Sequence, residues 1–123
     1  MSDPIFVFGS NLAGRHGKGA ALWAVQYRGA IYGYGEGLQG NSYAIPTKDR
    51  QLRSLGLDEI SARVMRFLRF ANDHRDMTFQ LTPVGCGLAG YTPEQIAPLF
   101  RAAPSNVILP DEFKAVLSPD PTP

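Results

Sequence analysis

The middle of the chain carries its most regular pattern of apolar and polar positions. From 57 to 71, apolar residues recur at intervals of three and four, and most positions between them are polar or charged. This spacing places the apolar side chains on one face of a helix. We therefore predict a helix over 57–71 whose buried face consists of Leu57, Ile60, Val64, Phe67, Leu68 and Ala71.

Three arginines, Arg63, Arg66 and Arg69, lie largely off this apolar face. They form either a solvated helix surface, which is the ordinary role of such charges, or a binding patch. The polar segment 72–76 predicts a break after the helix.

Shorter apolar segments predict strands. Residues 5–8 are continuously apolar and are bounded by Pro4 and Gly9, a pattern typical of a buried strand. Segments 78–84 and 106–109 predict two further strands, and 30–34 and 42–45 are shorter candidates.

Helices are predicted between and after these strands, over 19–27, from 93 to a point before Pro104, and over 111–117. Before the second of these, Thr92 and Gln95 form a capping-box pattern, and Pro93 suits the first turn. The alternation of strands and helices predicts an α/β layered sheet.

Glycines gather in two groups, and each group follows a predicted strand. Nine lie between Gly9 and Gly40, and three more lie at 85, 87 and 90, so the chain twice reads strand, glycine loop, helix. Glycine lets a ligand approach the backbone closely, and a helix N-terminus attracts anions. Because ligands of such sheets bind beyond the carboxyl ends of the strands, we expect both loops to share one cleft for a phosphate-containing ligand.

The segment 33–37, which precedes the predicted strand over 42–45, is too rich in glycine to form a helix. We expect a flexible flap there. Its Tyr34 and Glu36 are candidates for ligand contact, and the sequence does not decide whether they make it.

Composition narrows the class of protein. The 123 residues predict one domain over 1–117 and a frayed tail over 118–123. A net charge of +1 argues against nucleic-acid binding through bulk charge, although Lys48, Arg50 and Arg53 come close to forming a basic patch.

The remaining bulk features concern compartment and cofactors. Cys86 is the only cysteine, which excludes an internal disulfide and fits a reducing cytosol. No apolar run approaches the ~20 residues of a membrane span, and the N-terminus has no signal-peptide character. We expect a cytoplasmic protein without a membrane partner. No His, Cys and Asp cluster has metal-ligand spacing, so no metal or cofactor is expected.

The order of these pieces resembles the macro domain, a fold that binds ADP-ribose. Residues 10–21 are similar to its first ligand loop, 40–48 to its central strand segment, 84–91 to its second, phosphate-cradling loop, and 107–110 to its last strand. The resemblance runs from about 5 to 113. It implies a three-layer α/β/α macro-like domain with a central mixed sheet, in a minimal version.

Three segments look most like one branch of that fold, which contains bacterial DNA ADP-ribosyl glycohydrolases and a eukaryotic ADP-ribosyl-glutamate hydrolase. They are 16–19 (His-Gly-Lys-Gly), 45–48 (Ile-Pro-Thr-Lys) and 85–88 (Gly-Cys-Gly-Leu). The resemblance implies hydrolysis of an ADP-ribose linkage on DNA, protein or a small metabolite. It also implies ADP-ribosylated DNA or protein as a partner, and a bacterial or phage source.

The resemblance assigns two catalytic roles. Asn11 would contact the distal ribose, and the Lys18 amine would attack the anomeric carbon or stabilise charge there. An amine nucleophile needs a lowered pKa. Backbone N–H groups of the second loop would hold the diphosphate. The expected ligand contacts are Gly9, Ser10, Asn11, Gly17, Gly19, Ala20, Gly85, Cys86, Gly87, Leu88, Ala89, Gly90, Tyr91 and Phe113.

Several of these residues have a plainer alternative role. Asn11 is also a turn former, and Lys18 also suits a mobile loop that only attracts phosphate. His16 is either an acid–base group or phosphate contact, or an exposed loop histidine. Tyr91 would stack on the distal ribose and Phe113 on adenine, and both equally suit a core.

Cys86 has no activating base beside it in the sequence, so we expect a small packing residue rather than a nucleophile. Lys48, Asp49 and Arg50 contact either the ligand and its carrier or only solvent, as a charged surface turn.

Two departures from the family bear on activity. Ala89 stands where the eukaryotic hydrolase has an aspartate, and Asp49 is the nearest replacement acid in the sequence. The leading strands, with their adenine-binding aspartate, have no counterpart before Pro4. Retention of Lys18 favours a hydrolase, and loss of the acid favours a non-catalytic reader or sponge of ADP-ribose or a related nucleotide. A vestigial pocket in an interaction domain is a third possibility.

Overall fold

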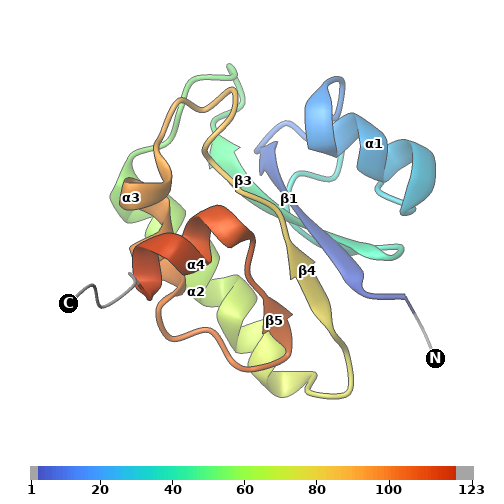
Figure 1. Ribbon diagram of the computed structural model, residues 1–123. Helices are drawn as coiled ribbons and strands as arrows, with labels where there is room; N and C mark the ends of the chain where they lie inside the picture. Colours follow the sequence, from blue (N-terminus) through green and yellow to red (C-terminus); the bar gives the residue numbers. More distant parts are fainter. Residues whose placement is uncertain (1–2, 119–123) are drawn as a thin grey trace.

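A five-stranded mixed sheet forms the centre of the protein in a computed structural model that describes residues 3–118 (Figure 1). The strand order is β2-β3-β1-β4-β5. All neighbouring strands are parallel except β2 and β3, which are antiparallel. The strands are β1 (Ile5–Asn11), β2 (Gly37–Gln39), β3 (Ser42–Lys48), β4 (Phe79–Leu81) and β5 (Val107–Ile108).

Helices cover both faces of this sheet, which gives three layers (Figure 1). Side chains alternate along β1, so Val7 points to one face and Phe8 to the other. One face carries α1 (Gly19–Tyr27) alone. The other carries α2 (Leu57–Asp73), α3 (Pro93–Ile96), the 3-10 turn η1 (Ala97–Phe100) and α4 (Asp111–Leu117). The predicted α/β class is confirmed.

The long amphipathic helix predicted over 57–71 is confirmed, and α2 continues two residues further, into the predicted polar break. Five residues of its predicted apolar face are buried, and Leu57 is partly buried. Phe67 packs against Tyr43 and Phe79, with ring centroids 4.9 and 5.4 Å apart. This helix therefore closes one face of the sheet.

The helix α1 has the predicted bounds and a buried face made of small residues. Ala21 and Ala24 pack against Phe8 and Ala44 of the sheet, so the helix approaches the strands closely. Trp23 of the same helix is partly exposed and packs on Phe6 of β1, with ring centroids 4.7 Å apart.

The other two helix predictions are confirmed, and only the helix that begins at 93 differs in form. The Thr92–Gln95 capping box is present at the start of α3, which continues into η1, and α4 has its predicted bounds. Strands predicted over 5–8 and 42–45 extend to Asn11 and Lys48. Those predicted over 78–84 and 106–109 are shorter. Of the predicted tail, 119–123 lies outside the described residues.

Two predictions between α1 and β3 are wrong. Segment 30–34 contains a turn at 32–33 rather than a strand, and the strand between α1 and β3 is β2, at 37–39. The segment 33–37 is not a free flap. Glu36 accepts hydrogen bonds from Arg63 Nη1 at 2.6 Å and Arg66 Nη1 at 3.2 Å, so these two arginines anchor the segment instead of only facing solvent.

Two glycines let this segment cross the loop that follows β1. A Cβ on Gly35 would collide with the carbonyl oxygen of Asn11, and a Cβ on Gly14 would collide with the backbone of Gly33. The Gly33 N–H also donates to the Gly14 carbonyl oxygen at 2.8 Å. Direct backbone contact therefore fixes the first loop (residues 12–18) against 33–35.

Replacing Gly35 with alanine is expected to destabilise the fold by about 2–3 kcal/mol, because overpacking of this kind forces backbone shifts. Urea unfolding measures the change. The matched control is Gly17→Ala on the same loop, since a Cβ there meets nothing within 4 Å. Equal stability of the two variants would contradict the close backbone crossing.

Candidate functional site

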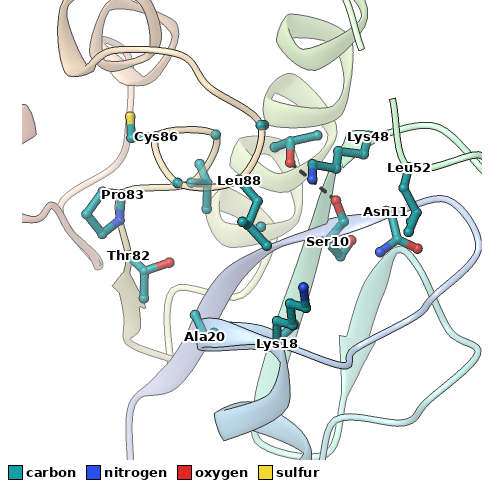
Figure 2. A pocket seen from close by; sticks show the side chains of 18 of the residues that line it. Ser10, Asn11, Lys18, Ala20, Lys48, Leu52, Thr82, Pro83, Cys86 and Leu88 are labelled. Atoms are coloured by element: carbon teal, nitrogen blue, oxygen red, sulfur yellow. Dashed lines mark hydrogen bonds between the residues drawn. The ribbon is translucent and has the colours of Figure 1, made fainter. Parts of the chain in front are cut away.

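A cleft of about 840 Å³ lies beyond the carboxyl ends of β1, β3 and β4 (Figure 2). The first loop and the start of α1 form one wall, and the second loop (residues 82–92) forms the opposite wall. The end of β3 and the turn after it complete the lining. Because these three strands are parallel, their outgoing loops meet at this edge.

Most of the predicted ligand contacts line this cleft. They come from both loops and from the end of β1. They are Gly9, Ser10, Asn11, Gly17, Lys18, Gly19, Ala20, Gly85, Cys86, Gly87, Leu88 and Ala89. Three others, Gly90, Tyr91 and Phe113, are not among the lining residues.

Phe113 and Tyr91 have other contacts. Phe113 is fully buried and packs on Phe100 with ring centroids 5.7 Å apart, so its expected stacking on adenine is wrong. The Tyr91 hydroxyl donates to the Leu55 carbonyl oxygen, which ties the end of the second loop to the start of α2. Both aromatic rings serve the scaffold behind the site.

Unpaired backbone N–H groups are concentrated on the two walls. Within residues 3–118, nine N–H groups on the two walls donate no hydrogen bond to the protein. They belong to Gly17, Lys18, Gly19, Ala20, Ala21, Gly85, Gly87, Leu88 and Ala89. The start of α1 also has no side-chain cap and no acidic residue in its first turn. Such N–H groups favour an anion between the two walls.

The charged side chains of the lining are mostly basic. Arg15, Lys18 and Lys48 line the cleft, and Glu112 is the one acidic lining residue. None of these four forms an ion pair within the described chain. Figure 2 shows Lys18 and Lys48 reaching toward the space between the loops from different elements. Their charge adds to the attraction for anions.

Asn11 combines the two roles considered for it. It lines the cleft, and its side chain closes a turn: Oδ1 accepts from the Arg15 N–H at 2.9 Å, and Nδ2 donates to the Arg15 carbonyl at 3.1 Å. One donor and one acceptor position of the amide remain for a ligand. The same bonds hold the first loop in place.

His16 is buried, with only 1% of its surface exposed, so the expectation of an exposed or flexible loop histidine is wrong. Its Nε2 lies 2.9 Å from the Tyr34 carbonyl oxygen and therefore carries the proton. The ring packs edge-on against Phe8, at 5.2 Å between centroids. The His16 side chain is thus buried beneath the first loop to which it belongs, and its contacts with Tyr34 and Phe8 support that loop.

Cys86 lines the cleft and is partly buried. Burial raises the pKa of its thiol, and the charges of Glu112 and Glu94 act in the same direction. The protonated thiol is therefore favoured, as the sequence predicts for a packing residue rather than a nucleophile.

The turn 48–54 is a rigid part of the rim. Asp49 Oδ1 accepts from the N–H groups of Gln51 and Arg53, both at 2.9 Å, and Oδ2 accepts from Arg53 Nε at 3.1 Å. Ser54 Oγ donates to the Ala89 carbonyl oxygen at 2.6 Å. The Asp49 carboxylate is thus engaged in its own turn, and it is not among the lining residues.

Several lining residues were not predicted from the sequence: Arg15, Tyr32, Thr47, Leu52, Thr82, Pro83 and Glu112. Thr47 is the last residue but one of β3, and Thr82 directly follows β4, so the strand predictions could have indicated both positions. Glu112 and Leu52 are far from both glycine loops in sequence and carry no local signal.

No protein-family model, no curated protein and no solved structure matches this chain. No helix within residues 3–118 is long and apolar enough to cross a membrane. In that same range, no group of three or more His, Cys, Asp and Glu side chains is placed to hold a metal ion.

The pKa of Asp49 is lowered, mainly by the Arg53 N–H hydrogen bond, with help from the Gln51 N–H and the Arg53 charge. Since the folded pKa lies below the unfolded value, the carboxylate stabilises the turn above the ordinary Asp pKa of about 3.9. That stabilisation is lost as the pH falls through the folded pKa.

An NMR titration of the Asp49 carboxyl carbon is expected to show a midpoint below about 3.9, with the Arg53 amide shifting at the same pH. In the Asp49→Asn variant, the change in the chemical shift of the Arg53 amide at that pH should disappear. A midpoint at or above the ordinary value would contradict the hydrogen-bonded turn.

Proposed function

We propose that this protein binds ADP-ribose in the cleft, with the diphosphate between the two loops. The observation that carries this proposal is the set of nine unpaired N–H groups on facing walls, together with three basic side chains. Preorganised N–H groups and cations bind a diphosphate strongly because the ligand replaces water with fixed donors. The volume of about 840 Å³ lies within the range of nucleotide-sized pockets.

The ligand has a defined direction in this proposal. The terminal ribose lies beside Asn11 and Lys18, at the β3 side of the cleft. The adenosine half lies toward Pro83, Cys86 and Glu112, at the β4 side. The Glu112 carboxylate is placed to accept hydrogen bonds from adenosine hydroxyl or amino groups.

The preferred activity is hydrolysis of a bond to the terminal ribose. The Lys18 amine would form a bond to the anomeric carbon as the linkage breaks and the leaving group takes the bonding electrons. Water would then displace the amine, which releases ADP-ribose and restores Lys18. Asn11 would orient the ribose through its remaining hydrogen-bonding positions.

A non-catalytic reader is the second candidate, and one observation favours it. Ala89 offers no carboxylate, Asp49 is engaged by Arg53, and the one acidic lining residue within residues 3–118, Glu112, is assigned to the adenosine half, so this part of the chain provides no acid for proton transfer at Lys18. A reader would use the same pocket and the same contacts without turnover.

Calorimetric titration is expected to give micromolar binding of ADP-ribose and weaker binding of ADP and AMP. Gly87 lines the cleft, and a Cβ there meets nothing within 4 Å, so larger side chains fit the fold but occupy the ligand space. Gly87→Phe should lose about tenfold or more in affinity, at least about 1.4 kcal/mol, while Gly87→Ala changes it little. No heat with any of these ligands would refute the proposal.

Assays on ADP-ribosylated DNA and protein separate the two candidates. A hydrolase predicts that Lys18→Ala abolishes release of ADP-ribose while binding is largely retained. Lys114→Ala is the control, since Lys114 is exposed on α4 and is not a lining residue. Binding without turnover in the wild-type protein would support the reader.

A further inference from the structure

Leu52 has an unusual backbone conformation for its residue type. Its φ is 65°, and within residues 3–118 no other residue except glycine has a positive φ. A bulky side chain in this region costs about 1–2 kcal/mol relative to the ordinary conformations. Glycine or asparagine would satisfy the same turn with less strain.

The surrounding turn holds Leu52 in that conformation. The Leu52 N–H donates to the Asp49 carbonyl oxygen at 3.1 Å, and the Asp49 carboxylate binds the backbone on both sides of it. Its side chain is 41% exposed and lines the cleft, so it contributes little to the core. The fold therefore does not explain why a leucine stands here.

A second exposed leucine lines the cleft from the second loop. Leu88 is 72% exposed, on the second loop, whereas Leu52 lies on the turn that follows β3, and both line the cleft (Figure 2). A single exposed leucine is ordinary on a protein surface. Here two exposed leucines on separate loops line one cleft, and one of them has a strained backbone. This combination indicates an apolar contact surface for a ligand, which we call the leucine contact.

The place of these leucines relative to the phosphate-binding walls suggests which part of the ligand they meet. In the proposed orientation, the terminal ribose lies beside Asn11 and Lys18, and Leu52 and Leu88 line the same cleft. Aliphatic side chains offer no hydrogen bond to a diphosphate or a ribose hydroxyl, so we assign the two leucines to the group attached to the anomeric carbon. Lys18 and Lys48 also line this region, and their charge disfavours a cationic group.

We propose that Leu52 and Leu88 bind a neutral, flat heterocycle attached to the terminal ribose of an ADP-ribose-type ligand. This inference rests on the proposed function and names the class of ligand that the site selects. A flat ring between two aliphatic side chains removes apolar surface of all three groups from water. Free ADP-ribose, with a hydroxyl at that carbon, leaves both leucines exposed.

The test is calorimetric titration of the full chain with four ligands: ADP-ribose, NADH, NAD⁺ and diadenosine diphosphate. NADH and diadenosine diphosphate carry a neutral ring on the second ribose, NAD⁺ carries a cationic ring of the same shape, and ADP-ribose carries none. We expect each neutral-ring ligand to bind about tenfold more tightly than ADP-ribose. A gain of this size corresponds to burial of roughly 50–60 Å² of apolar surface. NAD⁺ should bind less tightly than NADH.

Two variants at Leu52 show whether the leucine causes the difference. Leu52→Gly removes the side chain and suits the positive φ, and Leu52→Asn keeps a side chain that tolerates this conformation but is polar. Both are expected to abolish most of the preference for neutral rings and to leave ADP-ribose affinity within about twofold. Leu38→Ala is the matched control, because Leu38 is 43% exposed and is not a lining residue.

The outcomes separate this inference from the function on which it rests. If ADP-ribose does not bind to the wild-type protein, the proposed function fails. If ADP-ribose binds but neutral rings do not increase the affinity, or the increase persists in Leu52→Gly and Leu52→Asn, the leucine contact is overturned and the proposed function stands. NAD⁺ binding as tightly as NADH would overturn the choice of a neutral ring. An increase in affinity for NADH alone, or for diadenosine diphosphate alone, supports the leucine contact and identifies which ring the site accepts.

Discussion

The position of β1 at the centre of the sheet is the constraint on which the site depends. β1 pairs in parallel with β3 on one side and with β4 on the other, so that Phe6 lies opposite both Ser42 and Gln80. The segments that follow these three strands therefore leave the sheet at one edge. Two glycine loops and a tight turn, which are far apart in the sequence, become the walls and rim of one cleft as a consequence of this pairing.

Glycines serve two opposite purposes around that cleft. At Gly14 and Gly35, the missing side chain allows one backbone to lie directly on another, which fixes the first loop against the segment before β2. At Gly17 and Gly87, the missing side chain leaves space that a ligand can enter. The same residue type therefore provides both rigidity behind the site and access within it.

Support for the first loop comes from polar and aromatic contacts on its inner side. The buried ring of His16 bonds to the Tyr34 carbonyl, Asn11 bonds twice to Arg15, and Glu36 is held by two arginines of α2. A wall held in this way presents its N–H groups without rearrangement. Such preorganisation reduces the entropy lost when a ligand binds, which favours a recognition site for a diphosphate.

The sequence by itself determined the parts of the protein that depend on local pattern. The apolar spacing of 57–71, the capping box at Thr92 and the run after Pro4 predicted α2, α3 and β1, because helix and strand periods are written into neighbouring residues. The two glycine groups likewise predicted most of the cleft lining. Only the tertiary structure decided the burial of His16 and Phe113, the pairing of Glu36 with α2, and the place of Leu52 on the rim. These features depend on contacts between distant segments or on a backbone conformation imposed by a turn, and neither leaves a periodic signal in the chain.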